Sequence, residues 1–222
     1  MEIRLILTGD GSSTLFVPSL DEHYHSTFGA IRESQHIFIE AGFHAYTPKE
    51  TPCRIFEVGF GTGLNAFLTL LETEKSGIPV HYTSIESNPL EPSIVNELNY
   101  PELLGQENNS FFKDLHDAPW NRDVAVTKNF ILHKISGKIE EHNLPEGVFD
   151  LVYFDAFGPD VQPELWTENI FKKIYRSMKS GSILVTYSVK GSVKRALKSA
   201  GFTLEKLPGP PGKREITRAT KS

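Results

Sequence analysis

Apolar residues follow two spacings along this chain. Short, nearly continuous apolar runs are typical of strands buried on both faces, and apolar residues that recur every three or four positions are typical of helices. From residue 54 onward the two patterns alternate, which predicts βαβ units on a doubly wound, mostly parallel sheet. The expected strands of this part are RIFEVGF, VHYTSIES, NFILHKIS, FDLVYFD and SILVTYS.

Helices are expected between these strands. GLNAFLTLLETEKSG should end at Gly77, and EPSIVNELN predicts a shorter helix. A short helix is also expected near residues 138–142. A long one should begin at Pro163 and end before Gly181, since proline is favoured at a helix start and glycine after its end. After a last helix, VKGSVKRALKSAG, only a loop separates the strands FTLEKLPG and REITRAT, so these two should pair antiparallel.

The first fifty residues lie outside this alternation. IRLILTGDGSSTLFVP predicts a hairpin about a Gly/Ser turn. STFGAIRESQHIFIEAGF predicts a helix that Ser26 caps and Gly42 ends. Residues 100–123 fit no βα unit, and we expect them to be an insertion over the ligand-binding edge of the sheet. The sequence therefore predicts a single domain, residues 1–222, with an N-terminal extension (1–50) and a Rossmann-like core (51–222).

The composition is that of a soluble globular protein: of 222 residues, 39% are hydrophobic and 23% are charged. The apolar run near the N-terminus is too short for a signal peptide, and no run approaches the length of a membrane span. The single cysteine, Cys53, excludes an internal disulfide framework and fits a reducing, cytoplasmic location. Because Cys53 directly precedes a predicted strand, we interpret it as a packing residue.

Charge is distributed unevenly, although the net charge is only −5. From Lys172 to Ser222 there are 13 Lys or Arg residues and two acids, whereas residues 1–171 hold 10 bases and 26 acids. A basic face of this kind fits a phosphate-bearing partner. Basic helices that pair with acidic neighbours inside the fold would give the same composition, so composition alone leaves both interpretations open.

The first predicted strand of the core runs into a glycine-rich turn, EVGFGTGLN. Open α/β sheets bind ligands at the carboxyl ends of their strands. Gly59, Gly61 and Gly63 let the backbone turn tightly and approach a ligand closely. The helix that starts near Gly63 offers unpaired N–H groups to the same ligand.

Two classes of ligand use such a turn. GTGLNA satisfies the G-x-G-x-x-A form of a dinucleotide site. Against that stands Glu57, whose carboxylate would repel a pyrophosphate but suits the ammonium of S-adenosylmethionine. Glu86 ends the second strand, where an acid can accept both ribose hydroxyls of an adenosine. That ribose is common to both ligands, so only Glu57 favours S-adenosylmethionine.

The third and fourth strands end in further candidates. Beyond the third strand, backbone groups around Ser136 and Gly137 are expected to bind the adenine. Asp155 ends the fourth strand, beside the glycine turn in the usual strand order, and is expected near the sulfonium carbon and the incoming nucleophile. Phe157 follows it and could shape a slot for a planar group. A helix-capping role for Asp155 is disfavoured because the next helix is expected only at Pro163.

A metal site is not expected. Four histidines lie in the N-terminal extension, but no cysteine joins them and no H-x-x-x-H or H-E-x-x-H pattern occurs. Neither a G-x-S-x-G elbow nor a Walker loop is present.

Four stretches, EVGFGTGLN, SIESNPL, DAFGPDVQPELWTENIF and GKRE, carry a resemblance. The chain resembles the bacterial methyltransferase family that completes 5-methylaminomethyl-2-thiouridine at the tRNA wobble position. The likeness covers most of the chain, and the D-x-F-x-P…P-x-x-W-T-x-N-x-F run is its most specific part. The resemblance implies that Asp155 lies at the reacting centre. It also implies S-adenosylmethionine as the cofactor, bound by Glu57, Gly59, Gly61, Gly63, Asn65 and Glu86.

Two features depart from this family. Lys138 stands where the family has an acid after the third-strand glycine, and lysine cannot accept a hydrogen bond from adenine. In bifunctional members a flavin-dependent oxidase follows the methyltransferase domain, whereas this sequence stops at Ser222. The resemblance is therefore to the stand-alone form, for which a separate oxidase or another modification enzyme supplies the aminomethyl substrate.

The implied substrate base lies in the single-stranded anticodon loop of tRNA, where it can be splayed out and stacked on aromatic side chains. Phe157 is one candidate for this stacking, and Trp166 is either a second one or a core residue. The loop LPGPPGKRE is expected to place Lys213 and Arg214 at the cleft edge as phosphate ligands, and Lys190 would extend that patch. The alternative is that Lys213 and Arg214 pair with acids of the sheet edge.

These patterns together predict a Rossmann-like methyltransferase fold, in which a mostly parallel seven-strand sheet carries an N-terminal hairpin and helix. The predicted activity is transfer of a methyl group to the amine of 5-aminomethyl-2-thiouridine in tRNA, with Asp155 accepting or relaying the proton of that amine. Two alternatives stay open. One is a methyltransferase that acts on a small amine, and the other is a nicotinamide-dependent oxidoreductase, based on GTGLNA.

Overall fold

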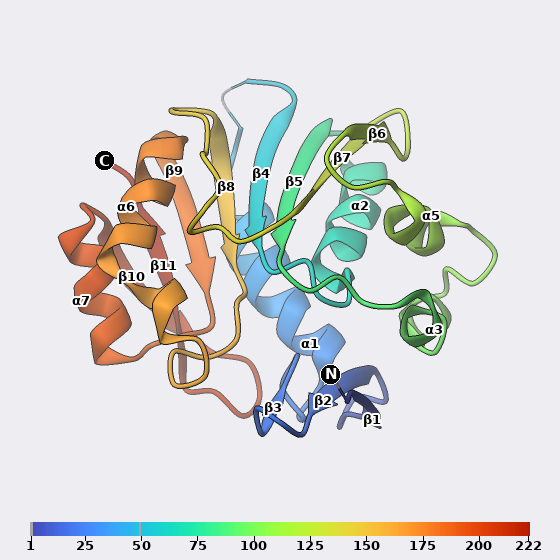
Figure 1. Cartoon of the computed structure of the whole chain (residues 1–222). Helices are drawn as coiled ribbons and strands as arrows, with labels where there is room; N and C mark the ends of the chain where they lie inside the picture. The colour runs from blue at the N-terminus through green and yellow to red at the C-terminus, as the bar shows by residue number, and fades with distance from the viewer. Residues whose placement is uncertain (1, 49) are drawn as a thin grey trace.

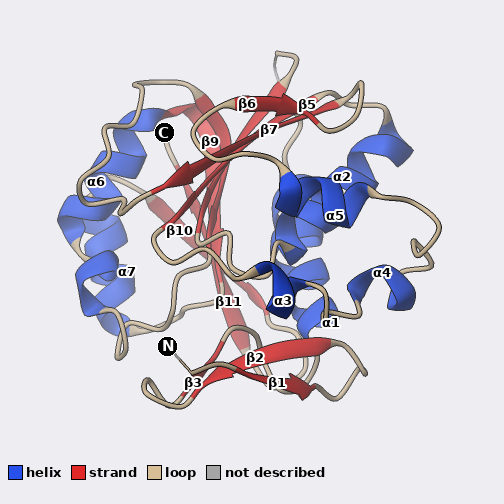
Figure 2. Ribbon diagram, turned by 45° about the vertical axis from the view of Figure 1, so that its right-hand side comes forward, coloured by secondary structure: helices blue, strands red, loops and turns tan. Residues whose placement is uncertain are grey.

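Two β-sheets organise the chain in this computed structural model, which describes residues 2–48 and 50–222 (Figure 1). Within these residues the large sheet has eight strands in the order β10-β11-β9-β8-β4-β5-β7-β6, and helices cover both of its faces (Figure 2). The five strands from β9 to β7 in this order are parallel. The predicted α/β fold with a mostly parallel sheet is therefore confirmed.

The large sheet contains one strand more than predicted. The additional strand, β6, has three residues and pairs antiparallel with β7 at the edge of the sheet. Three residues are too few to show a strand period in the sequence. The last two strands pair antiparallel, as predicted. The bounds are β4 (Cys53–Val58), β5 (Val80–Glu86), β6 (Asp123–Ala125), β7 (Phe130–Ser136), β8 (Phe149–Phe154), β9 (Met178–Thr186), β10 (Thr203–Pro208) and β11 (Glu215–Thr220).

Each face of this sheet has its own hydrophobic core. Alternate residues of the central strands point to opposite faces, so Tyr153 packs in one core and Phe154 in the other. The first core is closed by α1 (Ala30–Ser34), the π-helix η1 (Gln35–Phe43) that continues it, and α2 (Leu64–Ser76). The second is closed by α6 (Glu168–Ser177) and α7 (Gly191–Ser199). All six residues of β8 are buried because helices cover it on both sides.

The N-terminal extension forms a small sheet at one end of the molecule (Figure 2). The predicted hairpin is present as β1 (Arg4–Leu7) and β2 (Ser13–Val17), and the two-residue β3 (Glu22–His23) adds a third strand. The helix that follows begins at Ala30 and not at Ser26. Ser26 instead forms the preceding turn, where its Oγ accepts a hydrogen bond from the Phe28 N–H at 3.2 Å.

The expectation that Gly42 ends this helix is wrong. Gly42 lies inside η1, and a Cβ atom at this position would stand 3.1 Å from the ring of Tyr153 and 3.2 Å from a methyl group of Val185. The glycine therefore allows the helix to approach the sheet closely. Its role is packing and not termination.

Two other expected helices differ from the prediction. Residues 138–142 form turns. The segment after Pro163 is a 3₁₀ turn, η2 (Pro163–Trp166), and α6 starts afresh after Thr167, whose Oγ1 accepts from the Ile170 N–H. Because the Thr167 backbone is extended, this cap separates the two elements. At its other end α6 stops at Ser177, and β9 begins before Gly181 is reached.

The segment of residues 100–123 lies beside α2 rather than over the ligand-binding edge. It contains α4 (Tyr100–Leu103) and α5 (Phe111–Asp117), and the short α3 (Pro92–Val95) precedes it. Phe112 packs on Phe67 of α2, with 5.2 Å between ring centroids. Burial of this apolar side of α5 against α2 decides where the segment lies. In the described part of the chain, none of the helices is long and apolar enough to cross a membrane.

Candidate active site

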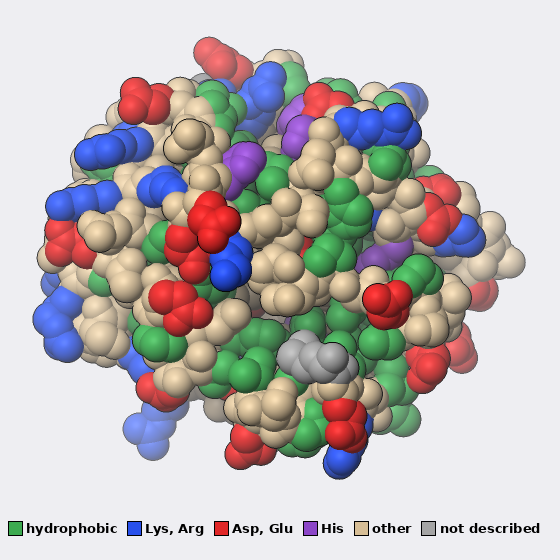
Figure 3. All heavy atoms as spheres, viewed as in Figure 1, with side chains coloured by type: hydrophobic (Ala, Val, Ile, Leu, Met, Phe, Trp, Pro, Cys, Tyr) green, Lys and Arg blue, Asp and Glu red, His purple; other side chains and the backbone are tan. Residues whose placement is uncertain are grey.

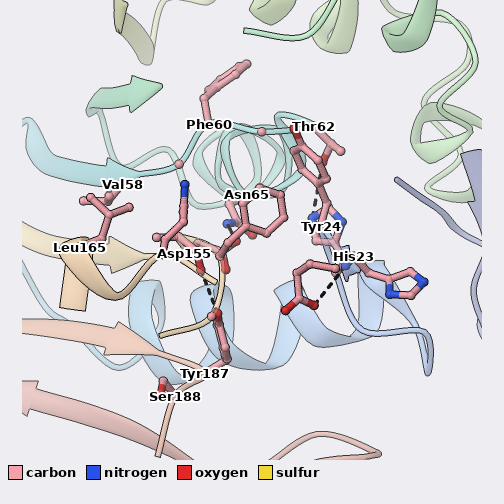
Figure 4. A pocket seen from close by; sticks show the side chains of 18 of the residues that line it. His23, Tyr24, Val58, Phe60, Thr62, Asn65, Asp155, Leu165, Tyr187 and Ser188 are labelled. Atoms are coloured by element: carbon pink, nitrogen blue, oxygen red, sulfur yellow. Dashed lines mark hydrogen bonds between the residues drawn. The ribbon is translucent and has the colours of Figure 1, made fainter. Parts of the chain in front are cut away.

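A cavity of about 1370 Å³ opens at the carboxyl ends of the parallel strands. Its walls come from the glycine turn after β4, from the loops after β5, β7, β8 and β9, and from two more distant segments. These are residues 20–28 of the extension and residues 212–215 between β10 and β11. Tyr24, Asn65 and Asp155 reach this space from three different segments (Figure 4). A site at the strand ends was predicted, whereas a wall from the extension was not.

The glycine turn has the tight geometry that its sequence predicts. Gly59 has φ of +93°, and a Cβ atom there would lie 2.7 Å from the carbonyl oxygen of Asp155. Gly63 has φ of +73° and starts α2, and a Cβ atom there would lie 2.8 Å from Nε2 of His116. Only glycine fits both the backbone conformation and the available space. The turn can therefore bring backbone N–H groups close to a ligand.

Glu86 lies on the cavity wall and is held by the backbone. Its Oε2 accepts from the Gly61 N–H at 3.0 Å, and its Oε1 accepts from the Asn88 N–H at 2.8 Å. Each carboxylate oxygen has a second lone pair. The carboxylate is thus fixed in position and still has acceptor capacity for two ribose hydroxyls.

The structure places Glu57 behind the cavity wall. Its side chain is fully buried and accepts from the Ser84 hydroxyl at 2.7 Å and from the Asn65 amide at 3.1 Å. Burial raises the pKa of the Glu57 carboxyl to about 8. Direct contact between Glu57 and a cofactor ammonium was expected, and this placement does not provide it. The side chain turns toward α2 because Asn65 and Ser84 satisfy its oxygens there.

Asn65 connects Glu57 to the cavity. Its Nδ2 also donates to Oδ2 of Asp155 at 2.8 Å, so one amide nitrogen bridges two carboxyl groups. The amide oxygen of Asn65 is buried and has no hydrogen-bond partner among the described residues. An unpaired buried acceptor is costly unless a ligand completes it. Asn65 lines the cavity, so an ammonium bound beside it is the kind of group that would complete this oxygen.

Asp155 is half-buried on the cavity wall, directly after β8. Burial, assisted by the negative charge of Glu33, raises the pKa of its carboxyl to about 7. The hydrogen bond from Asn65 and the charge of Lys213 act in the opposite direction. A carboxylate with a pKa near neutrality can hold an ammonium group and can also accept a proton from it. This is the chemistry predicted for the residue.

Three further side chains of the site were missed in the sequence. Glu33 of α1 is almost fully buried, lines the cavity and pairs with Lys213 at 3.3 Å. Tyr24 packs edge-on against Phe157, with 4.9 Å between ring centroids, and Tyr187 lies under the Lys213 ammonium at 4.8 Å. A signal for Glu33 did exist. It is an acid on the apolar stripe of its helix, where an unpaired charge would be costly.

The predicted substrate-binding residues all lie on this cavity. Phe157 faces inward against Tyr24. Arg214 is exposed, and no acid forms an ion pair with it in the described part of the chain. Lys213, in contrast, turns inward to Glu33, and Lys190 pairs with Asp160. Each of the two interpretations of the basic loop therefore applies to one residue. Lys213 pairs with an acid inside the fold, and Arg214 remains free for a phosphate.

Trp166 belongs to the core and not to the cavity. Its side chain is 5% exposed, and its Nε1 donates to the carbonyl oxygen of Phe157 at 2.8 Å. Beyond β7, Gly137 lines the cavity but Ser136 does not. The Ser136 N–H instead donates to the Asn121 side chain at 3.1 Å. Of the two residues expected to bind the adenine, only Gly137 reaches the cavity.

The basic segment after residue 171 serves both roles that its composition allowed. Six of its 13 Lys and Arg residues form ion pairs within the fold: Lys172, Lys179, Lys190, Lys206, Lys213 and Arg218. Lys and Arg side chains gather over the α6–α7 side of the face seen in Figure 3. The cavity wall itself carries nine acidic residues and four Lys or Arg. A wall of this charge favours a cationic cofactor and confines phosphates to the rim.

No group of three His, Cys, Asp or Glu side chains that could hold a metal ion occurs among the described residues. Cys53 is buried, and burial raises the pKa of its thiol to about 12. It therefore stays protonated at the start of β4.

The fold and this cavity define an S-adenosylmethionine-binding, Rossmann-like domain. A sequence model of a family described as "S-adenosyl-L-methionine-dependent methyltransferase" matches residues 113–222. The match covers 110 of the 222 residues, so this half of the chain is similar to S-adenosylmethionine-dependent methyltransferases, and S-adenosylmethionine is the cofactor.

Curated relatives carry a more specific name. The "tRNA 5-methylaminomethyl-2-thiouridine biosynthesis bifunctional protein MnmC" of Cupriavidus metallidurans is 32% identical over 231 residues, which is 96% of this chain and 33% of that protein. The protein of the same name from Aromatoleum aromaticum is 32% identical over 97% of this chain and 35% of its own length. This chain thus spans about a third of the length of these relatives.

A solved structure agrees with the fold over the whole chain. The crystal structure of MNMC2 from Aquifex aeolicus superposes with a TM-score of 0.80 at 28% identity, and covers 100% of this chain and 70% of that chain. The similarity includes the N-terminal extension, which distinguishes this architecture from the core sheet alone.

Proposed function

We propose that this chain methylates the primary amine of 5-aminomethyl-2-thiouridine at the tRNA wobble position, giving 5-methylaminomethyl-2-thiouridine. The observation that carries the proposal is Asp155, a half-buried carboxylate on the cavity wall with a pKa of about 7. It lies beside the glycine turn and suits an ammonium substrate. The printed names of the curated relatives, which refer to 5-methylaminomethyl-2-thiouridine biosynthesis, support this choice of substrate.

Residues on one side of the cavity are proposed to hold the cofactor. Glu86 binds the ribose hydroxyls, the free amide oxygen of Asn65 accepts from the ammonium, and backbone groups at Gly137 contact the adenine. The bound cofactor supplies a methyl group already activated on a sulfonium. The protein therefore mainly has to align the nitrogen with that methyl carbon and exclude water.

Asp155 is proposed to prepare the nucleophile. An aliphatic primary amine is mostly protonated near neutral pH, and only the neutral form has the lone pair that attacks. The Asp155 carboxylate first pairs with the ammonium and then accepts its proton. Glu57 and Asn65 act through Asp155, because the Asn65 amide fixes its Oδ2.

The remaining wall is proposed to bind the anticodon loop. Tyr24 and Phe157 form an aromatic slot into which a splayed base fits. Arg214, with Lys190 and Lys213, lies where the flanking phosphates would pass. Methyl transfer consumes a primary amine, so we also propose that a separate oxidase or another modification enzyme exposes this amine beforehand.

The proposal is tested with purified protein, labelled S-adenosylmethionine and bulk tRNA from cells that lack the modification. We expect label in the wobble nucleoside of the tRNA. Free small amines and reduction of a nicotinamide cofactor are assayed in parallel. Label on small amines but not on tRNA would replace the proposal with a small-amine methyltransferase. Hydride transfer without methylation would replace it with an oxidoreductase.

A further inference from the structure

An aromatic ring stands exposed at the rim of the cavity. The side chain of Phe28 is 58% exposed and still forms part of the cavity wall. It lies four residues after Tyr24, so one short segment supplies an inner ring and an outer ring to the same opening. Nothing in the proposed chemistry uses Phe28.

The ring is held against the loop between β10 and β11. A Cβ atom on Gly212 would lie 2.4 Å from Cδ2 and 2.7 Å from Cε2 of Phe28. Since real Cβ contacts are never so short, the ring occupies the space of a missing side chain. One side of the ring is therefore covered by the backbone of Gly212, and the exposed area lies on the rest of it.

The backbone of Phe28 is fixed as well. Its N–H donates to Oγ of Ser26 at 3.2 Å, and the carbonyl oxygen of Thr27 accepts from the Gly9 N–H at 2.8 Å. Just beyond, the Asp10 carboxylate accepts from the Arg32 N–H at 2.9 Å. A turn held from both sides presents the ring in one place. When a ligand stacks on the ring, this segment therefore loses little conformational entropy.

Two cationic residues follow the glycine on which the ring rests. Lys213 and Arg214 follow Gly212 in the chain, and Arg214 is the exposed residue for which the described structure shows no ion pair. Single exposed apolar side chains are common and need no explanation by themselves. A fixed aromatic ring and an unpaired arginine that line the same substrate cavity are the combination that binds single-stranded nucleic acid.

We propose that Phe28 is a stacking platform for a second RNA base, that of a nucleotide next to the one methylated. The inference rests on the proposed function and deepens it. The target base enters the slot between Tyr24 and Phe157, its neighbour stacks on the free face of Phe28, and Arg214 pairs with the phosphate between them. The rim thus contacts one nucleotide beyond the reacting base, so the protein binds RNA in preference to a free nucleoside.

The test compares full-length Phe28→Ala with Phe28→Tyr, which keeps a ring. Leu103→Ala is the matched control, because Leu103 is 45% exposed and does not line this cavity. The substrate is an anticodon stem-loop RNA that carries the aminomethyl base. We expect Phe28→Ala to raise KM for this RNA by roughly 5- to 100-fold, the usual effect of losing one base–aromatic stack. The kcat, the Kd for S-adenosylmethionine, and the KM of the other two variants should change by less than about twofold.

A second arm uses the same RNA with an abasic site on either side of the target nucleotide. When the abasic site replaces the neighbour that stacks on Phe28, this RNA should bind wild-type protein about as weakly as intact RNA binds Phe28→Ala. Phe28→Ala should then bind the abasic RNA only slightly more weakly still. The platform would be overturned if Phe28→Ala left the KM for the intact RNA unchanged. It would also be overturned if, for both neighbours, the loss of binding caused by Phe28→Ala added fully to the loss caused by the abasic site. If wild-type protein methylates neither RNA, the proposed function itself has failed.

Discussion

The two sides of the cavity are built in different ways. On the cofactor side, the ends of the adjacent strands β4, β5 and β8 meet, and their carboxylates are held by hydrogen bonds from backbone N–H groups and from buried amide and hydroxyl groups. On the substrate side, the wall joins residues 22–33, 156–160, 187–190 and 212–215, which are distant in sequence. There the charged groups are held by each other, as in the pairs Glu33–Lys213 and Asp160–Lys190.

This difference has a consequence for binding. Hydrogen bonds from backbone N–H groups and buried side chains fix the cofactor side before any ligand arrives, so little reorganisation is needed. Ion pairs between side chains at the rim are weaker, and a phosphate or an ammonium can replace one partner. We therefore expect substitutions on the cofactor side to change chemistry and stability. Substitutions on the substrate side should change affinity and its dependence on salt.

The largest effect is expected for Asp155→Asn. The amide keeps the shape of the side chain but cannot accept a proton, so turnover should fall by roughly 10²-fold or more while S-adenosylmethionine still binds. In the wild-type protein, kcat/KM should rise with pH through about 7, as the Asp155 carboxyl loses its proton. Single-turnover assays measure the rate of methyl transfer, and calorimetry measures S-adenosylmethionine binding. Asp117→Asn, on the exposed part of α5, is the isosteric control. Unchanged turnover would remove Asp155 from the chemistry.

Glu57→Gln should change how stability depends on pH. Burial raises the pKa of Glu57 from 4.5 to about 8, so between these values the folded state holds a proton that the unfolded state has lost. Wild-type protein should therefore lose stability as pH rises through this window, by about 1.4 kcal/mol for each step of one in pH. Asp155, whose pKa burial also raises, contributes in the same direction.

Removing the ionisable group at position 57 should remove its part of this loss. Relative to wild type, Glu57→Gln should gain on the order of 3 kcal/mol in unfolding free energy between pH 5 and pH 8. Denaturant titrations of the ligand-free protein at both pH values measure the difference, and the exposed Glu102→Gln serves as the control. An equal pH dependence in variant and wild type would contradict the buried, protonated state of Glu57.

Next in size is the double variant Lys213→Ala with Arg214→Ala. We expect weaker tRNA binding, unchanged S-adenosylmethionine binding, and a log–log salt slope that is flatter by about one to two units. The single variants sharpen the comparison: Arg214→Ala should account for most of the change, because Lys213 already pairs with Glu33. Filter binding across salt concentrations gives the slopes. Lys113→Ala with Arg122→Ala, both away from the cavity, is the matched control. If the double variant had the same salt slope as wild type, this rim would have no role in tRNA binding.

The smallest effects are expected at the exposed pair Lys190–Asp160, whose side chains are 45% and 82% exposed. A pair of this kind contributes less than about 1 kcal/mol to stability. Lys190→Ala should weaken tRNA binding by about two- to fivefold at low salt. Asp160→Ala should strengthen it, since it frees the lysine for a phosphate. Changes of the same sign in both variants would show that the pair acts as a structural unit instead.

Sequence patterns predicted the cofactor side more completely than the substrate side. Gly59, Glu86 and Asp155 were found because each follows a strand of the parallel sheet, and the carboxyl ends of such strands meet at one edge. Glu57 follows the same rule in sequence, yet it turns away from the cavity. Its direction depends on the hydrogen bonds that Asn65 and Ser84 offer, and such partners are visible only when α2 and β5 are packed together.

Local sequence determined the alternation of strands and helices, the tight glycine turn, and the acids at the strand ends, because strand burial, glycine conformations and the order of a parallel sheet are short-range properties. Only the tertiary structure decided that the N-terminal extension closes the cavity. It also decided that Glu33 holds Lys213, and that Phe28 rests on Gly212 at the rim. The partners in these contacts are about 180 residues apart in sequence. No local pattern encodes such contacts, since they form only when burial of the two apolar cores brings α1 and the loop between β10 and β11 to the same edge of the sheet.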